Sequence, residues 1–157
     1  MTSNNILVGV ISDTHGVLRP EAVAALRGSD MIIHAGDVGR PEVLDALRQL
    51  APTVAVRGNV DTQAWAAKLP VTEVVEINPL LIRLLHDIAE LDLDPAAAGF
   101  AAVIFGHSHK PSIEWRDGVL YLNPGSAGPR RFKLPVTIAR LRASGSTIEP
   151  EIVELDV

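Results

Sequence analysis

The chain has 157 residues, a net charge of −5 and no Cys, and 47% of its residues are hydrophobic, mainly Val, Leu, Ile and Ala. The length is that of one ordinary domain, so we expect a single domain over residues 1–157, and the lack of Cys excludes disulfides and thiolate metal sites. An acidic chain without a long basic run lacks the positive face that neutralises nucleic-acid phosphates, and we expect no nucleic-acid partner.

The beginning of the chain carries no recognisable targeting signal. Residues 1–5 contain no basic side chain, and the apolar run Ile6–Ile11 is too short for the hydrophobic part of a secretion signal. No apolar stretch approaches the length that crosses a bilayer. We therefore expect a cytoplasmic protein without a membrane partner.

The first two-thirds of the chain alternate apolar runs with helix-like segments, a pattern typical of an α/β domain. Pro20 and Pro41 favour helix starts, because the fixed φ of Pro suits the first helical turn. Asn78-Pro79 predicts a turn between two strands. The predicted elements, in chain order, are strand Ile6–Ser12, helix Glu21–Arg27, strand Met31–His34, helix Pro41–Leu50, strand Thr53–Arg57, helical turn Gln63–Lys68, strands Val71–Ile77 and Leu80–Leu85, helix Asp94–Gly99 and strand Ala101–Phe105.

The last third has a different pattern, in which short apolar runs are separated by Gly-containing turns such as Asp117-Gly118. The predicted strands here are Ile113–Arg116, Val119–Leu122, Val136–Arg142 and Thr147–Glu154. Together with the first part they predict an α/β fold with additional antiparallel strands. We expect two sheets with helices on their outer faces.

Five of the predicted strands are each followed by side chains that bind metals. These side chains are Asp13 and His15, Asp37, Asn59, His86, and His107 with His109. In α/β sheets, ligands gather beyond the carboxyl ends of the strands, where the chain leaves the core through loops. If the five strands lay parallel in one sheet, all seven side chains would meet at one edge.

The spacing and chemistry of these residues support a metal site. Asp13 and His15 are two residues apart, as are His107 and His109, and alternate residues of an extended chain point the same way. Gly, which permits sharp turns and close approach, precedes Asp37, Asn59 and His107. Carboxylate, imidazole and amide donors without thiolate suit first-row divalent ions. We expect two Mn²⁺ ions that share a carboxylate, with Fe²⁺, Ni²⁺ or Zn²⁺ as alternatives.

Taken singly, each candidate ligand has a structural interpretation. Asp13 or Asp37 alone would be a helix N-cap or a turn residue, Asn59 beside Gly would be a turn, and a lone His is more often a partly buried or surface residue. These interpretations fail jointly, because all seven residues lie at strand ends. Along the chain they occur in short motifs in the following order: Asp13-Thr14-His15, Gly36-Asp37, Gly58-Asn59, His86 and Gly106-His107-Ser108-His109.

This order resembles the signature of the calcineurin-like metallophosphoesterases, and especially their small YfcE-like phosphodiesterase branch. The resemblance covers nearly the whole chain, since Asn123-Pro124-Gly125-Ser126 and Pro129-Arg130 also look like the late loop of that branch. It implies a four-layer αββα sandwich of two mixed sheets flanked by helices. It also implies two metal positions bridged by Asp37: one held by Asp13, His15 and His109, the other by Asn59, His86 and His107.

The resemblance further implies a phosphodiesterase that acts on a small phosphoester, with Asp37, Asn59 and His86 as catalytic residues and a homo-oligomeric assembly. A hydroxide that bridges the two cations would attack phosphorus. One departure is Val60, where larger members carry a His that helps to protonate the leaving oxygen. General acid assistance is worth about 10²–10⁴-fold in rate. We therefore expect slow turnover, best with activated aryl or cyclic esters, unless Asp61 or a metal-bound water donates the proton.

Neighbouring polar residues receive more modest roles. Asp87 follows His86 where the family often has Gly, and we expect it to cap the next segment rather than to orient His86. Arg130 and Arg131 can clamp a substrate phosphate or be solvated loop cations, and the sequence favours neither. Structural roles are expected for His34 as a satisfied buried histidine, Asp61 as a helix N-cap and Ser126 as a turn residue.

Two other functions compete with hydrolysis. The retromer subunit of eukaryotic vesicle sorting resembles this branch and works chiefly through protein contacts, with a compromised metal site. The complete set of seven competent ligands in this chain favours catalysis over such a scaffold. A nuclease of the same superfamily is disfavoured by the small size and by the lack of a basic groove.

Overall fold

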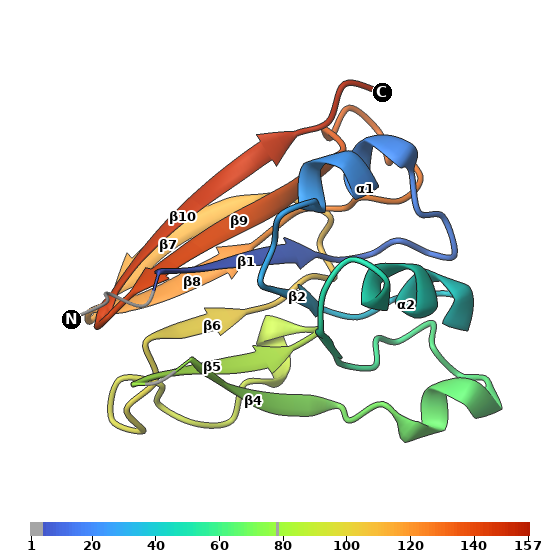
Figure 1. Ribbon diagram of the computed structural model, residues 1–157. Coiled ribbons are helices and arrows are strands. Elements are labelled where there is room, and N and C mark those ends of the chain that lie inside the picture. The colour runs from blue at the N-terminus through green and yellow to red at the C-terminus, as the bar shows by residue number, and fades with distance from the viewer. Residues whose placement is uncertain (1–4, 78) are drawn as a thin grey trace.

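The computed structural model describes residues 5–77 and 79–157, whose strands form two five-stranded sheets (Figure 1). The first sheet contains, in spatial order, β10 (Thr147–Glu154), β9 (Thr137–Ser144), β1 (Asn5–Ile11), β2 (Met31–His34) and β3 (Thr53–Ala55). The second sheet contains β4 (Thr72–Ile77), β5 (Leu80–Leu85), β6 (Ala102–Ile104), β8 (Val119–Asn123) and β7 (Ser112–Arg116).

Both sheets mix parallel and antiparallel pairs. In the first sheet β1, β2 and β3 are parallel, and β9 is antiparallel to both β1 and β10. In the second sheet β5, β6 and β8 are parallel, while β4 and β7 run antiparallel to their neighbours. The idea that the five ligand-bearing strands share one sheet is therefore wrong. β4 pairs with β5 as a hairpin instead of joining β3, and this hairpin starts a second sheet.

The apolar faces of the two sheets pack against each other. Alternate residues along each strand point into this core, as the period of two requires. Its central members are Val8 and Val10 of β1, Ile82 and Leu84 of β5, Ile104 of β6, and Leu120 and Leu122 of β8. Because the core lies between the sheets, it holds the carboxyl ends of β1 and β2 against those of β5 and β6.

Two α-helices, α1 (Pro20–Leu26) and α2 (Pro41–Arg48), cover the outer face of the first sheet (Figure 1). Each has Pro in its first turn, as the sequence predicts. Val43, Leu44 and Leu47 form the apolar stripe of α2 and are buried against this sheet. The 3₁₀ helix η1 (Ala64–Lys68) follows where a helical turn is predicted.

The outer face of the second sheet is covered by the 3₁₀ helix η2 (Ile88–Glu90) and the segment after it. There Ile88 and Leu91 pack on Val103 and Val119. The expected α/β sandwich of two mixed sheets is thus confirmed, with a short turn and a loop as its fourth layer. None of the helices in the described ranges is long and apolar enough to span a membrane.

The predicted helix Asp94–Gly99 is wrong, because this segment forms a single turn. Ala98 N donates to Asp94 O at 3.0 Å, and the Asp94 carboxylate accepts from Ala96 N at 3.1 Å. Gly99 then adopts a left-handed φ of +83°, which ends the turn before a second can form. The predicted turn at Asn78-Pro79 includes Asn78, which lies outside the described residues.

Candidate metal centre

The parallel pairing of β1 with β2 continues beyond the strands into the two loops that follow them. Asp13 N donates to Gly36 O at 3.0 Å, and His15 N donates to Asp37 O at 2.9 Å. The register of the two strands therefore determines that the Asp13–His15 loop lies beside Asp37.

Five of the predicted ligands have left-handed backbone conformations. Their φ angles are 55° at Asp13, 48° at His15, 55° at Asp37, 73° at His107 and 64° at His109. A left-handed non-Gly residue costs about 1–2 kcal/mol, and such conformations cluster at functional sites. The expectation that Asp13 and His15 point together along an extended chain is wrong, because both residues have left-handed and not extended φ angles.

Two glycines allow the ligand loops to approach one another. A Cβ built on Gly58 would lie 2.1 Å from Asp37 Oδ1, and one built on Gly106 would lie 2.1 Å from Ser12 Oγ. Neither distance leaves room for a carbon atom. The loops of β3 and β6 can therefore reach the loops of β2 and β1 only because these positions lack a side chain.

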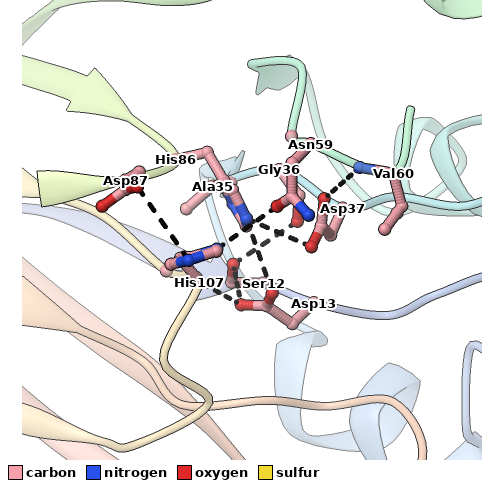
Figure 2. Close-up of polar contacts among 12 residues, drawn as sticks. Ser12, Asp13, Ala35, Gly36, Asp37, Asn59, Val60, His86, Asp87 and His107 are labelled. Carbon is pink, nitrogen blue, oxygen red and sulfur yellow. Dashed lines mark hydrogen bonds and ion pairs between the residues drawn. The ribbon is translucent and has the colours of Figure 1, made fainter. Parts of the chain in front are cut away.

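Asp13 and Asp37 each have one oxygen held by the protein (Figure 2). Asp13 Oδ2 accepts from Ser12 Oγ at 2.7 Å and from His107 N at 3.1 Å. Asp37 Oδ1 accepts from Val60 N at 3.0 Å. Among the residues that the structure describes, neither carboxylate pairs with a Lys or Arg. Asp13 Oδ1 and Asp37 Oδ2 are left to face the centre.

Imidazole nitrogens surround these two oxygens. Asp37 Oδ2 lies 3.1 Å from His86 Nε2 and 3.8 Å from His15 Nε2. Asp13 Oδ1 lies 3.4 Å from His109 Nε2 and 3.8 Å from His15 Nε2. Two sets of three residues each gather ligand atoms within 4.8 Å of one another: Asp13, His15 and His109, and Asp37, His86 and His107.

Asn59 joins the second set, since its Oδ1 lies 3.2 Å from His107 Nδ1. His86 Nδ1 lies 2.7 Å from Ala35 O, so Nδ1 carries the proton and Nε2 directs a lone pair at the two carboxylates. All seven side chains named from the sequence therefore meet at one place, although they come from two sheets.

The chemistry of this cluster fits divalent cations. Within residues 5–77 and 79–157, Asp13 Oδ1 and His86 Nε2 are buried and have no hydrogen-bond donor, and His109 Nδ1 is also buried without a partner. An unsatisfied buried polar atom costs about 1–3 kcal/mol. A cation held by the set of Asp13 would satisfy the first of these atoms and a cation held by the set of His86 the second, and both sets have the donor types that first-row divalent ions accept.

The proton affinities of the cluster reflect burial and opposing charges. Burial raises the pKa of the Asp13 carboxyl, against the lowering effect of the Ser12 hydrogen bond. Burial acts in the same direction on Asp37, but His86 in its protonated form and the hydrogen bond from Val60 N outweigh it and lower the pKa of that carboxyl. For His86, burial would lower the pKa, yet the two carboxylates raise it. The carboxylates of Asp13 and Asp37 thus favour a positive charge beside them.

Asp61 is neither an N-cap nor a proton donor, contrary to the expectations from the sequence. Its buried carboxylate accepts from Val38 N at 3.1 Å, Gly39 N at 2.9 Å and Gly58 N at 3.0 Å. These three bonds hold the β2 and β3 loops together. Asp87 caps η2 through Ala89 N, as expected, and its other oxygen lies 3.9 Å from His107 Nε2.

Three residues that support the loops were not recognised from the sequence. Ser12 binds the Asp13 carboxylate, and Asn123 donates to both Gly106 O and Ser108 Oγ at 3.1 Å. Ser126, expected to be a turn residue, donates to Asp13 O at 3.0 Å. The only signal for the last two was the similarity of their loop to the late loop of the phosphodiesterase branch.

Two clefts flank the cluster. A cleft of about 180 Å³ on one side is lined by residues that include Asn59, His86, His107, Asp87 and Glu90. A cleft of about 300 Å³ on the other side is lined by His15, His109, Pro129, Arg130 and Arg131. The side chains of this cluster thus form a floor between two open spaces.

The fold and this cluster define a calcineurin-like phosphoesterase. The chain belongs to that superfamily, because the family model for the calcineurin-like phosphoesterase superfamily domain matches residues 6–146. It is 35% identical over 160 residues to a probable metallophosphoesterase of Methanothermobacter thermautotrophicus. This match covers 94% of this chain and 92% of that protein. The family expected from the sequence is therefore confirmed.

Solved structures share the fold over nearly the whole chain. A predicted phosphoesterase from Streptococcus pneumoniae TIGR4 has a TM-score of 0.77 at 27% identity, covering 98% of this chain and 91% of that one. Vps29 from Entamoeba histolytica, solved in complex with Zn²⁺, has a TM-score of 0.70 at 25% identity, covering 95% of this chain and 99% of that one.

Proposed function

We propose that the protein is a phosphodiesterase that hydrolyses small phosphate diesters with two divalent cations. The observation that carries this proposal is a pair of buried acceptors that have no donor among the described residues: Asp13 Oδ1 and His86 Nε2 lie 3.8 Å apart, and His86 Nε2 lies 3.1 Å from Asp37 Oδ2. Asp13, His15 and His109 would hold one cation, Asn59, His86 and His107 the other, and Asp37 both. When bound, the cations supply the Lewis acidity that activates water and neutralises charge on the phosphate.

The protein's own groups keep this arrangement fixed before substrate arrives. Ser12 Oγ and His107 N hold one oxygen of Asp13, and Val60 N holds one oxygen of Asp37. The proton of His86 stays on Nδ1 because Ala35 O accepts it. Ligands that need no rearrangement lose little free energy on binding or reaction, which is the advantage of a preorganised site.

Protonation of the leaving oxygen is the weak step of this chemistry. Val60 is apolar, and the carboxylate of Asp61 is buried and occupied by three backbone N–H groups. Neither residue therefore supplies a proton. We expect slow turnover that depends on a good leaving group, such as an aryl oxygen or the strained oxygen of a cyclic ester.

The two clefts favour a diester over a monoester. A diester that places its phosphate on the floor of ligands has two substituents to accommodate, and the clefts of about 180 and 300 Å³ offer a place for each. A monoester would leave one of them filled only with water.

The direct test combines metal analysis with hydrolysis of bis-p-nitrophenyl phosphate. We expect the metal-free protein to be inactive and to regain activity with Mn²⁺, Fe²⁺, Ni²⁺ or Zn²⁺, with Mn²⁺ as the native ion. Asp37→Asn should abolish hydrolysis, whereas a change of the distant Arg142 should not. Failure of protein shown to contain two ions per chain to hydrolyse any diester would refute the proposal.

A protein-binding scaffold is the second candidate, because the solved Vps29 structure has the same fold. The complete ligand set argues for hydrolysis, and the assay above separates the two functions. We further propose a single domain over residues 1–157, a homo-oligomer, a cytoplasmic location and no nucleic-acid partner. Light scattering would test the assembly, and binding to labelled DNA and RNA would test the last point.

A further inference from the structure

Two arginines line the cleft on the side of His15 and His109. Arg130 and Arg131 come from the loop before β9 and share this cleft of about 300 Å³ with the two histidines. Arg131 therefore lines the same space as His15 and His109, the two histidines of the first ligand set.

Two further arginines lie beside the same loop of ligands. The side chain of Arg40 covers Gly16, since a Cβ built there would lie 3.1 Å from Arg40 Cγ and 3.2 Å from its Nε. Arg19 donates from Nε and Nη2 to Gly128 O at 3.3 and 3.2 Å. Gly128 in turn packs on the chain before His15, because its Cβ would lie 2.4 Å from Thr14 O.

None of these four arginines forms an ion pair with an Asp or Glu side chain that the structure describes, although Arg130 Nη2 donates to Val157 O at 3.4 Å. Across residues 5–77 and 79–157, the arginine ion pairs are Arg116 with Glu114 and Arg140 with Glu151, and neither involves this group. The chain as a whole has a net charge of −5, so arginines without an Asp or Glu partner on this side of the centre run against its overall charge. Such a group attracts an anion that the protein does not itself supply.

The cleft on the other side of the centre has the opposite character. It contains two carboxylates, Asp87 and Glu90, and a single arginine, Arg57. An anionic substituent placed there would meet like charges, whereas the same substituent in the other cleft would meet Arg130 and Arg131 and no lining carboxylate. The two sides of the centre therefore distinguish the two substituents of a diester by charge.

We propose that the preferred substrate carries a second anionic group, a phosphate or a carboxylate, on one of its two ester substituents, and that Arg130 and Arg131 bind this group. The inference rests on the phosphodiesterase function proposed above and names its substrate class. A guanidinium binds either anion through two parallel hydrogen bonds, and the second arginine adds charge. The uncharged substituent then occupies the cleft beside Asp87 and Glu90.

Binding of non-hydrolysable phosphonates tests this proposal. Calorimetry on the Mn²⁺-loaded protein would compare ethylphosphonate, 3-phosphonopropionate and propane-1,3-diphosphonate, which differ in the second group: none, a carboxylate or a phosphonate. We expect at least one of the two probes with a second anionic group to bind about tenfold more tightly than ethylphosphonate. The probe that binds better shows whether the site prefers a carboxylate or a phosphonate. This preference should disappear when Arg130 and Arg131 are both changed to Ala.

The matched control is Arg142→Ala, which removes an exposed arginine from β9 at the opposite end of β1, where it lies across from Leu7. The control should keep the preference. Equal affinity for all three probes would overturn the proposal, and so would a preference that persists in the double variant, because that would reflect chelation of the metal.

Hydrolysis of bis-p-nitrophenyl phosphate by the same preparations reports separately on the proposed function. Hydrolysis without any preference among the phosphonates would reject the anion site and leave the phosphodiesterase standing. A preference that depends on Arg130 and Arg131 in a protein without hydrolysis would retain the anion site and reject the enzyme.

Discussion

His34 Nε2 lies 3.0 Å from Thr14 Oγ1, and this buried pair links the loop after β1 to the loop after β2. Gly36 N donates to His34 Nδ1 at 3.1 Å, so the proton is on Nε2 and is donated to Thr14. The Thr14 hydroxyl then donates to Val38 O at 2.8 Å. A neutral histidine thus completes a chain of three hydrogen bonds directly behind the metal ligands.

Replacing His34 should destabilise the protein and loosen the metal centre. His34→Ala leaves the buried Gly36 N–H and Thr14 hydroxyl without their partner and opens a cavity, which we expect to lower the free energy of unfolding by about 2–4 kcal/mol. Thr14→Val removes only part of the chain and should cost about 1–2 kcal/mol. Urea unfolding of the metal-free proteins would measure both. An unchanged midpoint for His34→Ala would contradict this role.

His34 should also make the stability depend on pH. Burial lowers its pKa from 6.5 to about 3 in the folded protein, so between these values the unfolded chain binds the extra proton. The stabilisation is fully present above pH 6.5 and is lost as the pH falls toward 3. One such proton contributes a slope of about 1.4 kcal/mol per pH unit. We expect a His34→Gln variant to show a shallower loss of stability between pH 6 and about 4.

The test of this role is the difference between two slopes of stability against pH, that of the unchanged protein and that of His34→Gln. The pKa values of two neighbouring carboxyls are also shifted: burial raises that of Asp13, while, against the effect of burial, His86 and Val60 N lower that of Asp37. Both carboxylates are present in both proteins, so the difference between the curves isolates His34. Parallel curves would show that His34 is protonated without cost in the fold.

Gly58 should be required for metal binding rather than for folding. A Cβ at this position would lie 2.1 Å from Asp37 Oδ1, so Gly58→Ala must displace the carboxylate that we propose both metal positions share. We expect its affinity for the second divalent ion to fall about tenfold or more, in line with other changes to groups that orient metal ligands. Isothermal titration of the metal-free protein would measure the loss.

Gly145→Ala is the appropriate comparison for Gly58→Ala. Gly145 has a left-handed φ of 58° in the β9–β10 turn, and a Cβ there would meet nothing within 4 Å. This change should cost about 1 kcal/mol of stability through backbone strain and leave metal affinity unaltered. Equal metal affinity in the two variants would show that metal binding does not require the close packing of Gly58 on the Asp37 carboxylate.

The sequence could predict which residues meet, because strand ends are legible from apolar runs that stop at Asp, Asn or His. It could not predict how they meet. The left-handed backbone at Asp13 and His107 follows from contacts between loops of different sheets, such as the bond from His107 N to Asp13 Oδ2. Asp61 was misread for the same reason, since its partners Val38 and Gly39 lie more than twenty residues away.

Position 60, now Val60, is a place where a proton donor for the leaving oxygen could be introduced. Its backbone N–H binds Asp37, while 44% of the residue is exposed beside the centre. A side chain at this position can therefore change without disturbing the hydrogen bond. Val60→His would place an imidazole where it can protonate a leaving oxygen, with Val60→Phe as a control for size.

The effect of Val60→His should depend on the leaving group. An alkyl alcohol needs a proton to depart. We therefore expect kcat for a dialkyl phosphate diester, which has no p-nitrophenyl group, to rise about tenfold or more, up to the range that general acids provide. A p-nitrophenolate leaves without help, so kcat for bis-p-nitrophenyl phosphate should barely change. The gain should vanish at high pH, where the new imidazole has lost its proton. An equal gain on both substrates, or the same gain with Phe, would mean that the side chain acts on binding and not on proton transfer.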